Sequence, residues 1–182
     1  MKVKVSVLLM TLVSVFLFSC HQKKMSDNII THKPKAVKKK ATQTMSNYKQ
    51  SIPVKWLGNT YTIEVARHAN SSLPLADDGN GNKYYDNEVS LRILRSDHTE
   101  FVSRTFTKAN FKPYMDGQYL THGALLGVVF DKVQDNYLYF ACSVGSPDQM
   151  SDEYIPFLLK ISHSGEITIY KDNQLDTDNR EE

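Results

Sequence analysis

Short stretches of alternating apolar and polar residues recur along the chain, and they constrain its fold more than any other feature. In the stretch 61–65 every second residue is apolar, and the stretch 88–95 repeats the pattern. Successive side chains of a β-strand point to opposite faces of a sheet, so this alternation predicts strands with one buried face. We expect strands over residues 56–65, 88–95, 100–106, 125–133, 137–144, 157–162 and 166–170.

Turn-forming residues separate these stretches, and helical periodicity is scarce. Ser96–Thr99 and Asp135–Asn136 favour tight turns between antiparallel neighbours, and only 107–115 has the spacing for a short helix, with Thr107 as its cap. About seven or eight strands must close their sheet or stack it to hide one face and the edges. The sequence therefore predicts an all-β fold, a single antiparallel β-sandwich or partly open barrel with at most one short helix.

The N-terminus has the layout of a secretory signal peptide. Two lysines precede an apolar stretch over 5–18, which is too short to span a bilayer comfortably as a permanent helix. The residues at 17–20 resemble the bacterial lipobox, in which the cysteine is acylated with fatty acids such as palmitate and becomes the first residue of the mature protein. We therefore expect a signal peptide over 1–19 and lipid attachment at Cys20, which anchors the protein to a membrane.

Charge is divided unevenly along the chain. Residues 21–50 hold eight lysines and one acid, whereas residues 51–182 hold twelve lysines or arginines and nineteen acids. The basic segment has little apolar periodicity and cannot offset the entropy lost on ordering, so we expect the lipidated cysteine and a disordered tether over 20–50. A β domain over 51–172 and an acidic tail over 173–182 follow. The tether lysines could attract an anionic bilayer or form a solvated spacer.

The loop 77–88 has the spacing that most suggests chemistry. Four oxygen-bearing residues fall at the first, third, fifth and ninth positions of a calcium loop: Asp78, Asn80, Asn82 and Asp86. Lys83 occupies the sixth position, where glycine makes the sharp turn of such loops, and this favours an ordinary loop between strands. We expect no cofactor, with calcium at these four residues as the alternative.

The remaining reactive groups indicate no active site. The six histidines show no pair at metal-ligand spacing, and neither Gly-x-Ser-x-Gly nor His-Glu-x-x-His is present. Lipidation of Cys20 leaves Cys142 without a disulfide partner, and its alternating surroundings predict a buried apolar residue. The carboxylates at 148–153 could do acid–base work, although acidic surface loops without catalytic duty are commoner.

Tyr137 and Tyr139 suggest a binding surface. If they lie on the face opposite Leu138 and Phe140, they form an exposed aromatic pair that could stack on a sugar ring or a partner surface. Alternatively, the two tyrosines belong to a second buried face of the sandwich or barrel. We therefore take these two tyrosines as ligand-binding candidates.

Five short motifs are spread over most of residues 55–170. They are Trp56-Leu57-Gly58, Tyr85-Asp86-Asn87, Phe106-Thr107-Lys108 with Phe111, Ser151-Asp152-Glu153 before Pro156, and Ser164-Gly165. In combination they resemble an uncharacterised family of small lipoproteins from Gram-negative, Bacteroides-type anaerobes, which is defined by a domain of unknown function. The resemblance implies an envelope address and a single domain, and it brings no activity, substrate or catalytic residue.

These expectations combine into a function. We expect a membrane-anchored periplasmic lipoprotein that acts as a non-enzymatic module and binds an envelope protein or glycan. His21 rather than Asp follows the lipidated cysteine, which by resemblance to sorted lipoproteins implies the periplasmic face of the outer membrane. The alternative is a metal-dependent or acid–base hydrolase of an envelope glycan or peptide, using the loop 77–88 and the carboxylates at 148–153. Nucleic acid is not an expected partner of an exported protein.

Overall fold

The computed structural model describes residues 40–173. The predicted signal peptide over 1–19, Cys20, most of the predicted tether and nearly all of the predicted acidic tail lie outside the described residues. Within them, no helix is long and apolar enough to cross a membrane.

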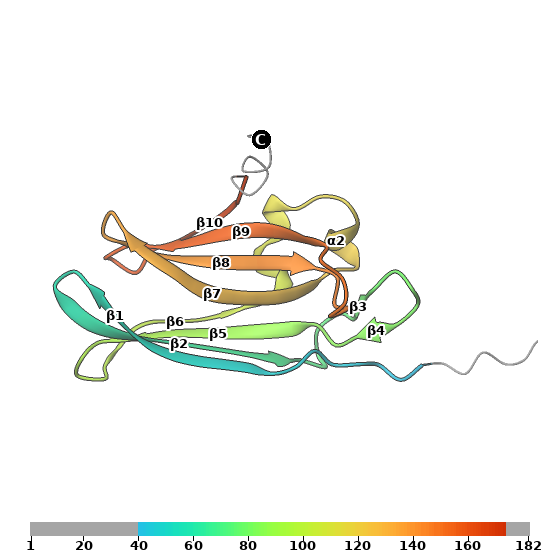
Figure 1. Cartoon of the computed structure of the whole chain (residues 1–182), viewed down its shortest axis with the longest axis horizontal. Helices are drawn as coiled ribbons and strands as arrows, with labels where there is room; N and C mark the ends of the chain where they lie inside the picture. The colour runs from blue at the N-terminus through green and yellow to red at the C-terminus, as the bar shows by residue number, and fades with distance from the viewer. Residues whose placement is uncertain (1–39, 174–182) are drawn as a thin grey trace, which may run out of the picture. The chain divides into compact units, whose positions relative to one another are not determined.

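The first half of the described chain forms a four-stranded antiparallel sheet (Figure 1). Its strands, in the order in which they pair, are β1 (Tyr48–Trp56), β2 (Asn59–Ala69), β5 (Asn87–Leu94) and β6 (Glu100–Phe106). Between β2 and β5 the chain makes a separate small hairpin of β3 (Ala76–Asp77) and β4 (Lys83–Tyr84). Apart from this hairpin, neighbours in the sheet are neighbours in sequence, as the predicted tight turns require.

The second half forms another four-stranded antiparallel sheet. Its strands are β7 (Ala124–Gln134), β8 (Tyr137–Gly145), β9 (Tyr154–Ile161) and β10 (Ile167–Lys171), each paired with the next. Three short helical turns connect β6 to β7: η2 (Lys108–Asn110), η3 (Lys112–Tyr114) and α2 (Gln118–Thr121). The predicted helix over 107–115 is thus two 3-10 turns, and the amide of Thr107 donates to Oδ1 of Asn110 at 2.9 Å at the start of the first.

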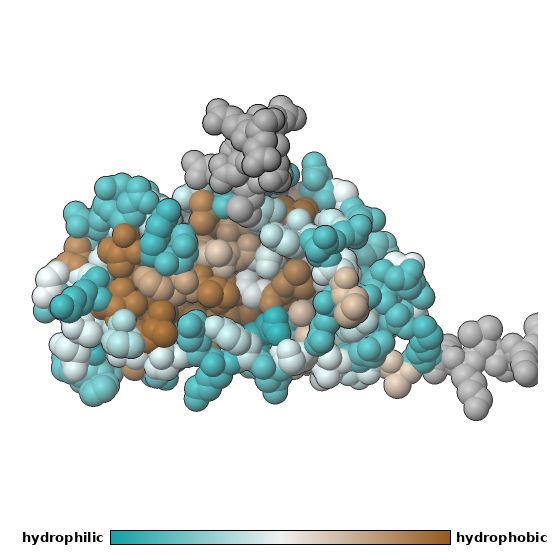
Figure 2. All heavy atoms as spheres, in the orientation of Figure 1, coloured by the Kyte–Doolittle hydropathy of each residue, from teal (hydrophilic) through white to brown (hydrophobic). Residues whose placement is uncertain are grey.

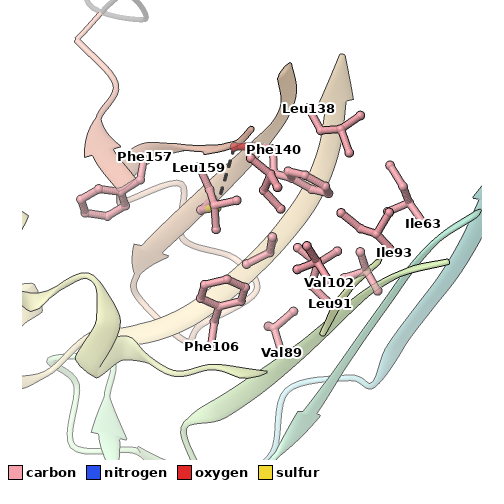
Figure 3. Close-up of a cluster of buried hydrophobic side chains, with 14 of the residues drawn as sticks. Ile63, Val89, Leu91, Ile93, Val102, Phe106, Leu138, Phe140, Phe157 and Leu159 are labelled. Atoms are coloured by element: carbon pink, nitrogen blue, oxygen red, sulfur yellow. Dashed lines mark hydrogen bonds between the residues drawn. The ribbon is translucent and has the colours of Figure 1, made fainter. Parts of the chain in front are cut away.

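Alternate residues of both sheets point into one shared core (Figure 3). Leu91 and Ile93 of β5 face Leu138 and Phe140 of β8, and all four side chains are fully buried. Burying an apolar side chain of this size stabilises a fold by roughly 1.5–3 kcal/mol relative to exposure. The two sheets stay separate and stack on each other, so the predicted all-β class is confirmed and the fold is a sandwich rather than a closed barrel.

The predicted strand over 56–65 starts with a hairpin turn and continues from Asn59 as β2. Leu57 and Gly58 form the two-residue turn between β1 and β2, with φ of 51° and 77°. Positive φ at both central residues is the type I′ geometry, whose twist matches that of the paired strands. Gly58 and Asn59 interrupt the alternation of apolar and polar residues in the sequence. This interruption marks the turn between two strands and not an irregularity within one strand.

The ordered sheet also begins before the predicted domain boundary at 51. β1 pairs with β2 from Tyr48 onward, so residues 48–50 belong to the sheet and not to the tether predicted over 20–50. Further upstream, the Gln43 amide donates to the carbonyl of Lys83 at 2.8 Å, and its carbonyl accepts from the amide of Tyr85 at 3.0 Å. These main-chain bonds dock the segment before β1 onto the β3–β4 hairpin.

The outer faces of the two sheets differ in chemistry. On the first sheet, Arg92 bonds to Glu64 at 3.1 Å and to Glu100 at 3.4 Å. On the second sheet, the exposed positions include Val129 of β7 and Ala141 of β8. Figure 2 shows apolar surface, in brown, on the side of the sandwich that faces the viewer. The outer face of the first sheet thus includes paired charges, whereas that of the second sheet combines apolar residues with tyrosines and lysines.

Candidate functional site

Three segments that are distant in sequence meet at one end of the sandwich (Figure 1). They are the end of the short strand β3, the segment from α2 to His122, and the loop from β8 to β9. Together they enclose a cavity of about 230 Å³, which we call the polar cavity. Its polar side chains include those of Asp77, His122, Tyr119 and Glu153.

Asp77 is the best-held group in the polar cavity. Its Oδ2 accepts from Nζ of Lys83 at 2.9 Å and lies 2.7 Å from Nδ1 of His122, while Oδ1 accepts from the amide of Gly79 at 3.0 Å. The bond from Lys83, together with those from Gly79 and His122, lowers the pKa of Asp77 to about 2. Asp77 is therefore a fixed anion near neutral pH, and it orients the exposed ring of His122.

A second hydrogen-bonded pair lies across the cavity. The hydroxyl of Tyr119 donates to Oε2 of Glu153 at 2.8 Å. Burial and this bond to a carboxylate raise the pKa of Tyr119, so the phenol keeps its proton. The close approach of the end of β8 to the residues at the start of β9 requires Gly145, because a Cβ there would overlap the main chain of Glu153 and Tyr154.

A buried ion pair supports the wall that carries His122. Nζ of Lys108 lies 3.8 Å from Oδ2 of Asp86, and both side chains are almost fully buried. Lys108 also donates to the carbonyls of Gly123 at 2.5 Å and Thr121 at 3.3 Å. Burial lowers the pKa of Lys108 and raises that of Asp86. This pair fixes η2 to the residues that flank His122.

The four residues with calcium-loop spacing do not converge. Oδ1 of Asp78 accepts from the amides of Asn80 at 2.8 Å and Asn82 at 3.1 Å, and Oδ2 accepts from the side-chain amide of Asn82. Asp86 instead faces Lys108, and its Oδ1 accepts from the amide of Leu125 at 2.8 Å. Over residues 40–173, no three His, Cys, Asp or Glu side chains are grouped as metal ligands. Calcium at this loop stays a prediction, and only Asp78 of the four lines the polar cavity.

Tyr137 and Tyr139 lie at the start of β8, while the polar cavity lies beyond its end. Both tyrosines are half-buried on the outer face, and Leu138 between them is buried in the core. Their ring centroids are 6.4 Å apart. Nζ of Lys160 lies 3.6 Å from the ring centroid of Tyr137 and 5.8 Å from that of Tyr139. The sequence thus indicated an aromatic surface but not the lysine placed over it.

The remaining reactive groups take structural roles. The thiol of Cys142 is buried in the core and lies 3.8 Å from the carbonyl oxygen of Phe140, and burial raises its pKa to about 12. A thiol with that pKa is protonated and unreactive at neutral pH. Of the carboxylates at 148–153, Asp148 accepts from the amide of Met150 at 3.0 Å within its own loop, whereas Glu153 reaches the polar cavity.

Sequence reasoning missed His122 as a site residue. It lies 45 positions from Asp77, and its neighbours in the chain carry no recognisable catalytic motif. Asp86 and Lys108, in contrast, lie within two of the five short motifs noted in the sequence. Those two motifs therefore mark the buried support of the cavity, whereas a third, Ser151-Asp152-Glu153, contributes Glu153 to its polar lining.

Comparison with known proteins gives a family without an assigned activity. No curated protein matches the sequence. The family model for DUF4738, a domain of unknown function, matches residues 27–169. That range covers well over half of the chain, including the first sheet, all but the last two residues of the second sheet, and every residue of the polar cavity. The chain therefore belongs to the DUF4738 family of domains of unknown function.

Proposed function

We propose that this protein is a lipoprotein anchored through Cys20 to the periplasmic face of the outer membrane, and that it binds an envelope ligand without transforming it. The signal-peptide layout and the lipobox-like residues at 17–20 support the address. The observation that carries the binding role is the polar cavity, in which pre-positioned donors and acceptors from three segments face one space.

The ionisation states of the cavity groups favour binding over chemistry. Asp77 stays an anion because its pKa lies at about 2, and Tyr119 keeps its proton because its pKa is raised. Groups that keep one protonation state near neutral pH serve as fixed hydrogen-bond partners rather than as proton carriers. The cavity therefore matches a ligand with both donors and acceptors.

The size of the cavity limits that ligand. At about 230 Å³ it is smaller than the roughly 300–1,000 Å³ typical of sites for drug-sized molecules. A single sugar ring or one to two residues of a peptide is the expected occupant. Glycan and peptide strands of the envelope both expose units of this size.

Capture from envelope extract tests the binding role. The full acylated chain, purified in detergent, serves as bait beside a Glu153→Gln variant, which keeps the shape of the side chain and removes its charge. We expect a specific glycan or peptide with the unaltered chain and less of it with the variant. Equal recovery by both forms, or no specific recovery by either, would contradict binding at the polar cavity.

Fractionation tests the address separately. A Cys20→Ser variant lacks the sulfur to which the lipid would be attached, so it should leave the membrane fraction and become soluble. A variant that still sediments with outer membranes would rule out the lipid anchor. The binding role does not depend on this result, because the cavity lies within the folded domain.

One observation favours the alternative, an acid–base hydrolase of an envelope glycan or peptide. The polar cavity unites Asp77 and Asp78 of the loop 77–88 with Glu153 and adds His122. Because Nδ1 of His122 is engaged with Asp77, its Nε2 is left to exchange a proton with a substrate, which is the arrangement of an oriented general base. Release of reducing ends or free amines from isolated envelope polymers, abolished in His122→Asn, would establish this activity. Their absence under all pH values from 5 to 8 would exclude it.

A further inference from the structure

Lys160 lies on the outer face of the second sheet, near the end of β9. Its neighbours on β9, Leu159 and Ile161, are buried in the core, so the side chain of Lys160 points to the outer face. Lys160 pairs across the sheet with Tyr139 of β8 and Thr168 of β10. Its ammonium group contacts the faces of two tyrosine rings, at 3.6 Å for Tyr137 and 5.8 Å for Tyr139. Ring faces attract a cation, so the rings hold this lysine in place.

Among residues 40–173 the ammonium of Lys160 has no anionic partner, unlike Arg92 and His68 on the first sheet. There Arg92 pairs with two carboxylates, and His68 lies 2.8 Å from Glu88. In the part of the chain that the structure describes, Lys160 forms no ion pair within 4.0 Å. A second cation, Lys132, lies 6.0 Å from the ring centroid of Tyr139 on the same face. Lys132 has Asp131 at 4.0 Å, whereas the ammonium of Lys160 is held by aromatic rings.

A hollow of about 270 Å³ surrounds this lysine. It is lined by Tyr137, Lys160, Ser162, Glu166, Thr168 and Tyr170. Ser162 is already bonded within its own turn, with its hydroxyl 2.8 Å from that of Ser164. The groups left for a ligand are thus two phenols, one aliphatic hydroxyl, a carboxylate at the rim and the ammonium.

We propose that this hollow binds an acidic saccharide, with the carboxylate of the sugar on Lys160 and its ring against the tyrosines. The aromatic rings supply flat apolar area for the C–H face of a sugar ring. Glu166 and Thr168 can accept and donate hydrogen bonds to sugar hydroxyls. The ammonium supplies a charge-assisted hydrogen bond to an acidic group, which a neutral sugar cannot use. The site lies beyond the start of β8 and does not depend on the polar cavity.

Calorimetric titration with defined sugars tests this assignment. The full chain, purified in a detergent without a sugar headgroup, is titrated with trigalacturonic acid, with neutral galactotriose of the same length, and with acetate. We expect saturable binding of the acidic trimer, at least tenfold weaker binding of the neutral one, and none of acetate. Equal binding of both trimers would overturn the role of charge, and equal binding of acetate would reduce the site to a contact for any carboxylate.

Variants assign the site to its residues. Lys160→Met keeps the alkyl stem and removes the charge, and should weaken trigalacturonate binding by about 10- to 100-fold, the range for one charge-assisted hydrogen bond. The control Lys55→Met removes the same charge from an exposed position on β1 and should change affinity less than twofold. His122→Ala should also leave it unchanged. Unaltered affinity in a folded Lys160→Met would refute the proposal.

The aromatic contribution has its own matched pair. Tyr137→Phe keeps a ring that lines the hollow and should retain most of the affinity, whereas Tyr137→Leu removes it and should weaken binding about tenfold. Thermal unfolding of each variant shows whether the domain is intact, because the half-buried ring also packs on its neighbours. Equal affinity in folded Tyr137→Phe and Tyr137→Leu would show that no sugar stacks there.

Discussion

The buried ion pair of Lys108 and Asp86 gives the sharpest prediction. If one charge is removed, the other stays buried without a partner of opposite charge. Lys108→Met removes the ammonium and leaves the Asp86 carboxylate with only amide partners at 2.8 Å from Leu125 and 2.7 Å from Asn87. The variant also strips the buried carbonyl of Gly123 of its donor. Breaking a buried pair on one side costs about 3–5 kcal/mol, so we expect a fall in Tm of roughly 10–20 °C.

Urea unfolding followed by tryptophan fluorescence measures this loss. The chain has one tryptophan, Trp56, which is buried in the core and lies 5.1 Å from the ring of Tyr61 between centroids. The double variant Asp86→Asn with Lys108→Met removes both charges and keeps an oxygen for the two amides. We expect it to lose about 1–3 kcal/mol less than the sum of the single variants. A loss under 1 kcal/mol in Lys108→Met, or strict additivity, would refute the ion-pair interpretation.

The pH dependence of the same variant has a defined sign. Burial raises the pKa of Asp86, and Lys108 counteracts part of that rise. Without the lysine the folded pKa is higher still. A carboxyl whose pKa is raised on folding stabilises the protein below its unfolded pKa of about 4, and that contribution is lost as pH rises through the folded value. Lys108→Met should therefore be closer to the unaltered protein in stability near pH 5 than near pH 8.

Other residues give further predictions. Gly145→Ala should lower stability by about 1–3 kcal/mol in urea unfolding and weaken ligand capture, because the added methyl overlaps the main chain of Glu153; an unchanged midpoint would contradict the close approach. The pKa of Asp77, at about 2, lies below its unfolded value, so its stabilisation should be lost as pH falls from about 4 to 2, and Asp77→Asn should flatten that part of the stability curve. Millimolar calcium should leave Tm unchanged, because the oxygens of Asp78 are bonded within the loop; a rise of several degrees would establish a calcium site. Cys142 should react with a thiol reagent only at the rate of unfolding, as measured by absorbance.

The sequence predicted those strands that have one face buried in the core and the other face exposed to solvent. β6 has the predicted bounds of 100–106, and the predicted turn at Asp135–Asn136 joins β7 to β8 with positive φ at both residues. β1 was missed because Pro53 and the mostly polar residues before it obscure the alternation of Ile52, Val54 and Trp56. Proline is compatible with this strand because β1 lies at the edge of its sheet.

The polar cavity could not be predicted, because it depends on how loops approach one another. Tyr119 and Glu153 are 34 positions apart, and only the packing of α2 against the end of β8 brings them together. At the loop 77–88 calcium stays a prediction, and the spacing of the four oxygen-bearing residues did not show where their side chains point. Lys83 begins β4, and the carboxylate of Asp86 lies 3.8 Å from the ammonium of buried Lys108.

The docking of Gln43 on the β3–β4 hairpin determines how the domain responds to mechanical load. A pull applied through the residues that precede it meets the two main-chain bonds of Gln43 and the contact of Met45 with the side-chain amide of Asn87 at 3.0 Å. Only after these contacts break can β1 peel from β2 one residue pair at a time. We expect Gln43→Pro, which removes the amide donor, to unfold at lower force in optical tweezers while its urea midpoint changes little. A domain held at its N-terminal side would thus resist tension first through the contacts of Gln43 and Met45, and only then through the pairing of β1 with β2.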